Sequence, residues 1–301
     1  MRVKKLFICI LVVVLALVVL SACKHSELSD ATFKNEIPGV TGPGSKTITF
    51  GLYDLDGKIN DAKFIDNGEN TFIKKLSIGH YLDQESTYMI MLFTDFIQQK
   101  FWVANELSNN HSVKINPNSA INFEINAEIP KNTKELAIII VRNPDSTSNG
   151  NNLKKSLNDQ NTFVLRYLIE NDGLIEKKYL KPVSTNSKAL EEVFLSQSNI
   201  KHELLFEKKG DSPVHLLVGN MNNQKLDYSL IALYDWQQVQ IENKLVNYAS
   251  VEPGQTNVYD IYLPPSKMNN LPFQILAFPA PFDENSAFSK NMYSTFRIAI
   301  Q

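Results

Sequence analysis

The sequence predicts a mostly β fold, in which two tandem β-sandwich domains follow a signal peptide and a flexible tether. Three observations lead to this prediction. Short apolar or alternating runs recur along the chain with turn residues between them, which is typical of sandwiches rather than of alternating α/β folds. Similar runs recur in the second half of the chain, and only one stretch has the period of a helix.

Four runs show the strand patterns most clearly. Thr47–Tyr53 and Ala120–Asn126 alternate in the manner of strands with one buried face. Tyr88–Phe93 and Leu136–Val141 are apolar on both faces, which is the pattern of central strands that are covered on both sides. We therefore expect sheets with buried central strands and half-buried neighbours.

One stretch has the helical period instead. In Ser187–Leu195 the apolar residues Leu190, Val193 and Phe194 fall on one face of a helix. The pattern predicts a helix at this point.

The runs in the first half of the chain are repeated in the same order in the second half. We expect two tandem copies of one β-sandwich (Ig-like) domain, domain 1 at 46–170 and domain 2 at 171–301. Generic alternation at low identity is the alternative explanation. The matches are Glu85–Leu92 with Gly210–Leu217, Gln99–Phe101 with Gln224–Leu226, Ile115–Ser119 with Val251–Gln255, Asn122–Ile125 with Val258–Ile261, the strand ending at Asn143-Pro144 with that ending at Phe278-Pro279, and Thr162–Ile169 with Tyr293–Ile300.

The first 23 residues have the layout of a secretory signal peptide. Three basic residues precede the apolar run Leu6–Leu20, and small residues lead to Cys23. The end of the run, Leu20-Ser21-Ala22-Cys23, resembles the lipobox of the bacterial lipoprotein class. This resemblance implies that a diacylglyceryl group is attached to the Cys23 thiol and that signal peptidase II removes 1–22. Residues 23–45 then form a lipidated tether.

Two other interpretations of this segment remain. The apolar run has 15 residues, whereas a membrane-spanning helix needs about 20, so an uncleaved anchor fits less well than a cleaved signal. An ordinary secretory signal would need the cysteine to fall at the cleavage site by chance. Two acyl chains anchor a protein stably. The sequence therefore places the protein on the outer face of the cell membrane.

Composition excludes several classes of function. Removal of the three basic residues of the signal peptide leaves 27 basic and 32 acidic residues, so the mature chain has no basic stripe for nucleic acid. The only cysteines are Cys9 and Cys23, and the mature domains therefore lack disulfides, thiolate metal sites and cysteine nucleophiles. A cysteine-free exterior protein rich in Asn and Lys fits a Gram-positive cell.

Motifs for catalysis or metal binding are weak. Asp54-Leu55-Asp56-Gly57 has closely spaced carboxylates, but its glycine stands too early for a calcium loop, and a hairpin turn explains the same residues. Gly210-Asp211-Ser212 resembles the nucleophile motif of a lipase/esterase family, but no histidine follows His215 to act as its base. The five histidines lack metal-ligand spacing. We predict no catalytic residue, metal or cofactor.

Aromatic residues are the remaining functional signal. Phe278 and Phe282 flank a proline-rich loop, and Tyr234 and Trp236 lie in or beside a strand. Exposed aromatics at the end of a sandwich would form a partner-binding patch. The alternative is that these side chains belong to the core.

The function that fits best is that of a lipid-anchored extracytoplasmic binding or assembly protein. It would contact the membrane through lipidated Cys23 and hold a protein or cell-wall partner. The alternative is a cell-envelope hydrolase whose site is not visible as a motif. A pocket with carboxylates and histidine would favour the hydrolase. A solute-binding lipoprotein ranks lower because βαβ units are missing.

Overall fold

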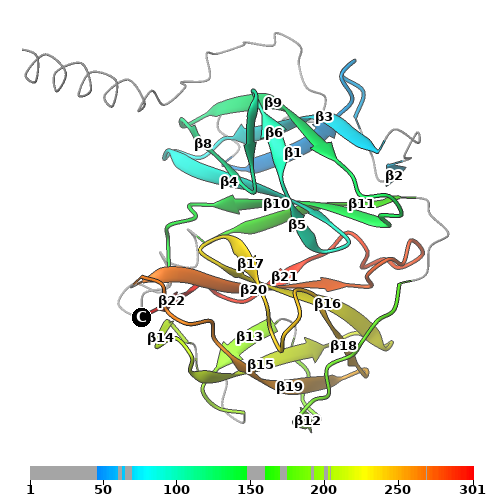
Figure 1. Cartoon of the computed structure of the whole chain (residues 1–301), viewed down its shortest axis with the longest axis vertical. Coiled ribbons are helices and arrows are strands. Elements are labelled where there is room, and N and C mark those ends of the chain that lie inside the picture. Colours follow the sequence, from blue (N-terminus) through cyan, green and yellow to red (C-terminus); the bar gives the residue numbers. More distant parts are fainter. Residues whose placement is uncertain are drawn as a thin grey trace, which may run out of the picture. The chain divides into compact units, whose positions relative to one another are not determined.

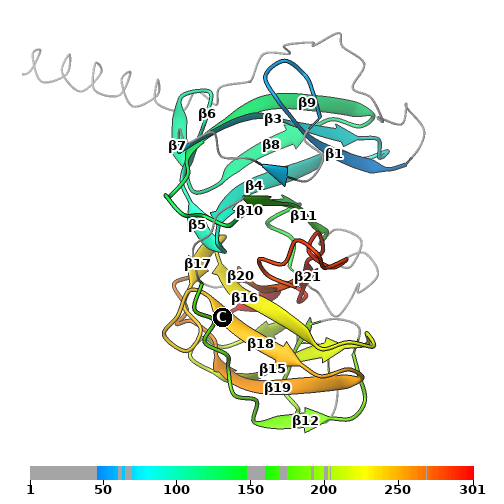
Figure 2. The same ribbon diagram turned by 90° about the vertical axis from the view of Figure 1, so that its right-hand side faces the viewer.

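The computed structural model describes residues 46–59, 63–64, 70–147, 160–169, 175–190, 193–199, 203, 205–268 and 270–301. All regular elements within these residues are β-strands, so the predicted fold class is confirmed (Figures 1 and 2). The predicted signal peptide, Cys23 and the whole predicted tether, 23–45, lie outside the described residues.

The first half of the chain forms two sheets that face each other. Sheet I has the strand order β1-β3-β9-β6-β7, and sheet II has the order β2-β11-β10-β4-β5, with β8 also paired to β4. We call this pair of sheets repeat 1. Its strands are β1 (Ile48–Tyr53), β2 (Lys63–Phe64), β3 (Thr71–His80), β4 (Ser86–Thr94), β5 (Ile97–Gln99), β6 (Phe101–Val103), β7 (Glu106–Ser108), β8 (His111–Ile115), β9 (Ser119–Glu128), β10 (Glu135–Arg142) and β11 (Thr162–Ile169).

The second half forms sheets III and IV in the same manner. Sheet III has the order β14-β22-β20-β16-β17, with β18 paired to β16 and β21 to β20, and sheet IV has the order β12-β19-β15-β13. We call this pair repeat 2. Its strands are β12 (Ser184–Asn186), β13 (Val193–Ser196), β14 (Glu207–Lys208), β15 (Pro213–Asn220), β16 (Leu226–Tyr234), β17 (Gln237–Val239), β18 (Asn247–Val251), β19 (Gln255–Tyr262), β20 (Leu271–Pro279), β21 (Tyr293–Ser294) and β22 (Ile298–Ile300).

The four predicted strand runs are confirmed as β1, β9, β4 and β10. In β1 and β9 of sheet I, alternate side chains point into the core of repeat 1. These include Leu52 of β1 and Phe123 and Ile125 of β9. No sheet combines strands from before Ile169 with strands from after Ser184. The predicted boundary between two domains at 170/171 stays a prediction.

The predicted helix is wrong for the described part of Ser187–Leu195. Val193–Ser196 is strand β13, and Val193 and Leu195 point into the core of repeat 2 with the strand period of two. The preceding chain lies across sheet IV, because the Leu190 N–H donates to the Thr256 hydroxyl and the Leu190 backbone passes over Gly219. Strand pairing and packing therefore override the helical period.

Strand registers show that the two repeats are equivalent. Tyr88 pairs with Val113 of β8, and Tyr228 pairs with Ala249 of β18 in the same position. Three of the six predicted matches agree with this register. They are Ile115–Ser119 with Val251–Gln255, Asn122–Ile125 with Val258–Ile261 and Thr162–Ile169 with Tyr293–Ile300.

The first two predicted matches are wrong. The first paired β4 with β15, whereas β4 is equivalent to β16 and β15 to β3, with an offset of 140 residues. The second paired Gln99 with Gln224, which is equivalent to Gln84. The correct offset aligns identical residues, which are Gly79 with Gly219, Gln84 with Gln224, Tyr88 with Tyr228, Asp95 with Asp235, and Gln98 with Gln238. The match at Asn143-Pro144 is displaced by two residues, because Asn143 is equivalent to Ala280.

A third core joins the two repeats. Strands β4 and β10 of sheet II, and β16 and β20 of sheet III, are apolar on both faces, and their second faces pack together. This explains why Tyr88–Phe93 and Leu136–Val141 have no polar face. The buried members of this core are Met91, Phe93, Phe96, Ala137, Ile139, Val141, Ile231, Leu233, Trp236, Leu276 and Phe278.

Two hairpin turns insert aromatic rings into this third core. Phe96 and Trp236 both have left-handed backbones, with φ of 65° and 59°, although bulky residues rarely adopt such values. The Phe96 ring centroid lies 4.9 Å from that of Phe278 and 5.2 Å from that of Phe282. The two-residue turns between β4 and β5 and between β16 and β17 therefore serve to place rings at the interface.

Polar contacts across this interface are reciprocal. The Gln98 N–H donates to Gln238 Oε1 at 2.8 Å, and the Gln238 N–H donates to Gln98 Oε1 at the same distance. Each glutamine also donates through Nε2 to the carbonyl of the other repeat's turn residue, Trp236 or Phe96. Such exchange of equivalent contacts is the mark of an isologous interface.

Two equivalent arginines complete the reciprocal pattern. Arg166 of β11 donates to the Pro279 carbonyl of repeat 2, and Arg297 donates to the Arg142 carbonyl, which is the equivalent position of repeat 1. Both guanidinium groups are buried. Arg166 also pairs with Glu135 at 2.6 Å, whereas burial lowers the pKa of Arg297 to about 9.

Candidate ligand-binding groove around Trp102

The aromatic residues selected from the sequence lie inside the protein. Phe278 is part of strand β20, not of the following loop, and its side chain is fully buried with Trp236 in the third core. Tyr234 is buried in the core of repeat 2, and Phe282 packs partly buried against the third core. These four side chains are thus core and interface residues in this structure.

The predicted turn at Asp54-Leu55-Asp56-Gly57 is confirmed. The Gly57 N–H donates to the Asp54 carbonyl at 2.9 Å, and Gly57 has a φ of 89°. The Asp54 carboxylate pairs with Lys74. In the part of the chain that the structure describes, no group of three His, Cys, Asp or Glu residues could hold a metal ion.

The Gly210-Asp211-Ser212 segment is also a turn before a strand, since β15 begins at Pro213. His215 of this strand binds Asp260 of β19 through Nδ1 at 2.7 Å. A hydrolytic triad would need a nucleophile on the other ring nitrogen, and no serine hydroxyl is bonded to it among the described residues. The pair is a partly exposed cross-strand contact on the outer face of sheet IV.

The repeats differ most at a hairpin that only repeat 1 has. The residue offset between the repeats is 140 at Gln98 and 136 at Ile115, so repeat 1 is four residues longer between these points. The longer segment forms β6 and β7 at one edge of sheet I. In repeat 2 the same place holds a short turn closed by Ile241 and Lys244.

Alternation along β6 positions Trp102. Phe101 and Val103 point into the core of repeat 1 and are 1% and 2% exposed. Trp102 between them therefore faces outward and is half-buried. Among the described residues, its pairing with Asn126 is the one ladder pair between β6 and β9. The hairpin is thus held to the sheet at one point, beside which the surface is hollowed.

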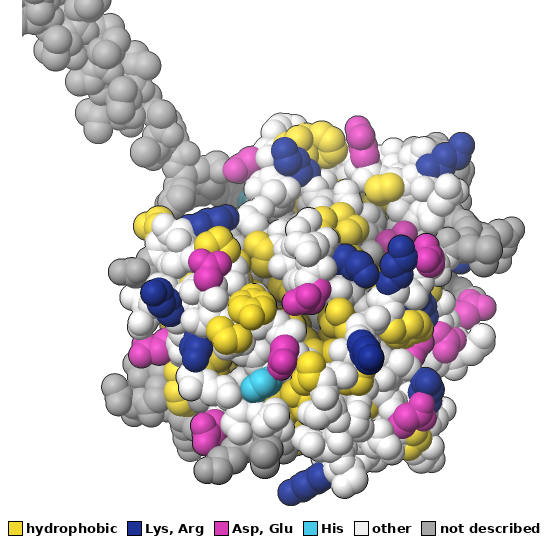
Figure 3. Space-filling model, turned by 60° about the horizontal axis from the view of Figure 1, so that its bottom comes forward, with side chains coloured by type: hydrophobic (Ala, Val, Ile, Leu, Met, Phe, Trp, Pro, Cys, Tyr) yellow, Lys and Arg dark blue, Asp and Glu magenta, His cyan; other side chains and the backbone are white. Residues whose placement is uncertain are grey.

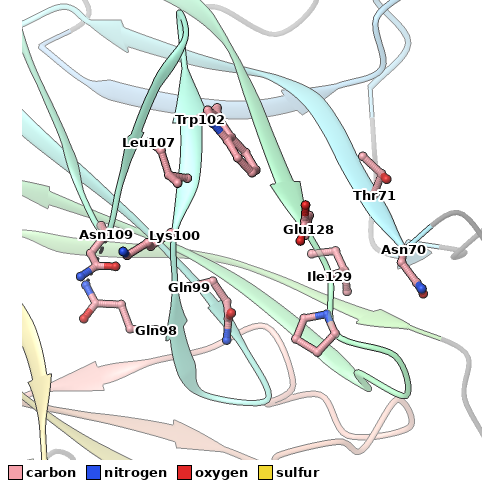
Figure 4. A pocket seen from close by; sticks show the side chains of 11 residues that line it. Asn70, Thr71, Gln98, Gln99, Lys100, Trp102, Leu107, Asn109, Glu128 and Ile129 are labelled. Atoms are coloured by element: carbon pink, nitrogen blue, oxygen red, sulfur yellow. Dashed lines mark hydrogen bonds between the residues drawn. The ribbon is translucent and has the colours of Figure 1, made fainter.

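Two open grooves share Thr71, Trp102 and Glu128 as lining residues. The larger has a volume of about 790 Å³ and the smaller about 610 Å³, and Figure 4 shows the residues that line the larger one. The other residues of the larger groove are Asn70, Gln98, Gln99, Lys100, Leu107, Asn109, Ile129 and Pro130, and those of the smaller groove are Ala104, Asn105, Glu124 and Asn126. Volumes of this size accommodate small-molecule ligands.

Polar groups in these grooves differ in their availability. Gln98 and Asn109 are bonded to repeat 2, through Trp236 and Gln237, and so belong to the interface. Asn126 and the carboxylates of Glu124 and Glu128 have no hydrogen-bond or ion-pair partner among the described residues. The Trp102 indole N–H likewise has none, so it can donate to a ligand.

The opposite end of the described molecule offers a different surface. Figure 3 brings the end with sheet IV forward and shows hydrophobic side chains in separate places between acidic and basic ones. Tyr262 and Met268 are the most exposed of the large hydrophobic residues, at 65% and 69%. This mixed surface lacks the partly enclosed shape of the Trp102 grooves.

Sequence analysis missed Trp102. The run Phe101-Trp102-Val103 is apolar throughout and follows the pattern of a buried strand. The signal that would have found it is the four-residue difference between the repeats, which becomes visible only with the 140-residue offset. The extra residues of repeat 1 form a hairpin that carries a tryptophan and that repeat 2 does not have at the equivalent position.

Comparisons with known proteins identify no family. No family model and no curated protein matches the chain. Solved structures with some likeness include the Escherichia coli chaperone DraB (7% identity, 84% of this chain and 98% of that chain, TM-score 0.25), the CsuC–CsuE chaperone–tip adhesion subunit complex of Acinetobacter baumannii (10%, 82% and 98%, 0.24) and the Pseudomonas aeruginosa CupB2 chaperone (10%, 80% and 98%, 0.23). This likeness concerns the β-sandwich fold alone. Within the described ranges no helix is long and apolar enough to cross a membrane.

Proposed function

We propose that the protein is a lipid-anchored extracytoplasmic binding protein that holds a cell-envelope ligand in the grooves around Trp102. The observation that carries the binding site is the departure of repeat 1 from repeat 2. The two repeats share the strands that face the interface, but they differ at one sheet edge: repeat 1 has the β6–β7 hairpin and its grooves beside β9, whereas repeat 2 has β12 beside β19.

The proposed anchor rests on the sequence alone. The lipobox-like segment ending at Cys23 supports lipidation, and the chain between Cys23 and β1 supports a tether of about 20 residues. A flexible tether of that length spans roughly 25 Å. It would keep the binding domain near the membrane surface while leaving it free to reach the cell wall.

Replacement of Cys23 by alanine tests the anchor. The variant cannot carry a thioether-linked lipid, so we expect it to appear in the culture medium while the parent stays with the membrane fraction. The measurement is an immunoblot of both fractions. Retention of Cys23→Ala in the membrane to the same extent as the parent would contradict the proposed lipidation.

Site-specific photo-crosslinking in living cells tests the binding site. A photoreactive amino acid at Leu107, which lines the larger groove and is 46% exposed, should capture an envelope component. The matched control is the same amino acid at Met268, which is exposed in repeat 2. Identical products at both positions, or no product at Leu107, would contradict a site in this groove.

A further inference from the structure

We propose that the ligand of the Trp102 grooves is a neutral glycan chain, an inference that rests on the proposed binding site. The first observation is the shape of the site. The two grooves share Thr71, Trp102 and Glu128, so they are neighbours on the surface and one extended ligand could occupy both. A chain of repeating units fits this arrangement better than a compact molecule.

The second observation is the chemistry of the lining. An indole ring provides a flat apolar surface with a donor at its edge, and the C–H face of a pyranose ring matches such a surface. Asn126 lies directly beside Trp102 across the sheet, as its ladder partner. An amide both donates and accepts, and so does each hydroxyl of a sugar.

The third observation is the charge. Glu124 and Glu128 flank the Asn126 position on β9 and have no ion-pair partner among the described residues. Two free carboxylates disfavour an anionic polymer, while they accept hydrogen bonds from neutral hydroxyls. Lys100 provides one positive charge in the larger groove, so the site as a whole does not select a strongly cationic ligand.

A peptide partner fits these observations less well. Peptide anchors occupy desolvated apolar pockets, and the apolar residues here, which are Leu107, Ile129, Pro130 and Ala104, are spread over two open grooves. Strand addition needs a long free edge. At the hairpin itself, the edge strand β7 has only three residues.

Tryptophan fluorescence provides a direct test, since the chain has two tryptophans. Trp236→Phe removes the buried one by introducing the aromatic residue type that repeat 1 has at Phe96, and it leaves Trp102 as the only reporter. The full-length lipidated variant in detergent micelles is titrated with tetrasaccharides of β-1,4-linked glucose and of β-1,4-linked N-acetylglucosamine. We expect a saturable change in emission with at least one of them.

Calorimetry with a second set of variants locates the binding. Trp102→Ala should weaken the affinity for the active tetrasaccharide roughly tenfold or more, and Asn126→Ala should weaken it several-fold. His215→Ala on sheet IV is the matched control and should leave the affinity unchanged. Asn126→Ala keeps the test valid if Trp102→Ala fails to fold, because Asn126 contributes no core side chain.

Three results would overturn the glycan assignment. These are no emission change with either tetrasaccharide, equal affinities for parent and Asn126→Ala, or a stronger response to tetralysine or tetragalacturonate than to the neutral sugars. If crosslinking at Leu107 still captures a protein, the glycan assignment fails while the binding site stands. If crosslinking at Leu107 also fails, the proposed site fails with it.

Discussion

At the residue scale, equivalent positions of the two repeats make the same bond with different side chains. His80 Nε2 donates to the Gln84 carbonyl at 2.6 Å, and Asn220 Nδ2 donates to the Gln224 carbonyl at 2.9 Å. His80 Nδ1 also lies 2.7 Å from the Tyr88 hydroxyl. Because burial lowers the pKa of His80, the ring is neutral at pH 7.5, and Nδ1 then accepts a hydrogen bond from this hydroxyl.

This arrangement makes the stability of the protein depend on pH. Burial lowers the pKa of His80 below its usual value, so the unfolded chain binds a proton more readily than the native state does. Stability that is present at neutral pH is therefore lost as the pH falls through about 6.5, and the loss levels out below the folded pKa.

His80→Asn tests this dependence. The variant has the residue of repeat 2 and retains a donor for the Gln84 carbonyl, but it loses the hydrogen bond with the Tyr88 hydroxyl. We therefore expect its free energy of unfolding at pH 7.5 to be about 1 kcal/mol lower than that of the parent. The difference in stability between pH 7.5 and pH 5 should be smaller than in the parent. Urea unfolding at the two pH values measures both effects. An unchanged pH difference would show that His80 does not titrate on unfolding. His111, whose pKa is also lowered by burial, remains in both proteins and supplies the residual slope.

Glu135 and Arg166 form an ion pair in which each side chain is only 1% exposed. Burial raises the pKa of Glu135, while Arg166 opposes this effect. The equivalent of Glu135 in repeat 2 is Pro272, and Arg297 there is bonded to backbone carbonyls instead. Repeat 1 therefore depends on a charge pair where repeat 2 does not.

We expect Glu135→Ala to destabilise the protein by roughly 3–5 kcal/mol, because it leaves the Arg166 guanidinium buried without its counter-ion. The control is Lys114→Ala, which breaks the exposed pair with Glu85 and should cost less than about 1 kcal/mol. Chemical denaturation gives both values. A similar loss of stability in the two variants would show that the buried ion pair stabilises the protein no more than the exposed one.

At the element scale, the tight turns show that left-handed backbone positions serve two purposes. Ala104, in the turn between β6 and β7, has a φ of 48° and is exposed. Phe96, in the turn between β4 and β5, has a φ of 65° and is buried. Glycine suits both backbones, but only the second position also holds a ring in the core.

Introduction of glycine should therefore change the stability of the protein in opposite directions at the two turns. Ala104→Gly is expected to stabilise the protein by up to about 1 kcal/mol, because glycine adopts the left-handed backbone without strain. Phe96→Gly is expected to destabilise it by roughly 3 kcal/mol or more, because the ring contacts with Phe278 and Phe282 are lost. Thermal unfolding measures the signs. Stabilisation by Phe96→Gly would show that backbone strain outweighs the packing of the ring.

A strand could be predicted from the sequence where its pattern of apolar and polar residues depends only on which side faces the core. Thr47–Tyr53 alternates because β1 has one core-facing side, and its assignment needed no tertiary information. The helix at Ser187–Leu195 was predicted incorrectly because the period alone does not reveal that Val193 pairs with Val218 of β15. Pairing with a strand that lies elsewhere in the sequence decides such cases.

The candidate site could not be predicted in the same way. Trp102 and Phe278 both stand in apolar runs, yet the first faces a groove and the second lies in the third core. What separates them is that the outer side of sheet III, which contains Phe278, is covered by sheet II, whereas the outer side of sheet I, which contains Trp102, has no such layer among the described residues. Single-sequence patterns indicate that a strand is apolar on both faces but not what covers the second one.

At the scale of the whole molecule, the third core makes each repeat dependent on the other. If repeat 1 were separated from repeat 2, its Met91, Phe93 and Phe96 side chains would be exposed to water, together with the outward face of β10. Contiguous apolar surface of this kind leads to association. The two repeats are therefore expected to fold as one unit.

Expression of residues 46–170 alone tests this dependence. We expect the fragment to self-associate, because the surface that normally contacts repeat 2 is apolar and carries the self-complementary Gln98. Light scattering after size-exclusion chromatography measures its mass. A well-folded monomer at micromolar concentration would contradict the prediction. Addition of Met91→Lys and Phe93→Lys should restore the monomer if the third-core face is responsible.

The reciprocal interface also determines the valency of the molecule. A symmetric dimer of identical chains would carry any inserted hairpin twice. Here both halves belong to one chain, and the long hairpin with Trp102 occurs in one half only. Each molecule then offers a single binding site, so firm attachment to a repetitive polymer must come from avidity between many anchored copies, and retention should rise steeply with their density on the membrane.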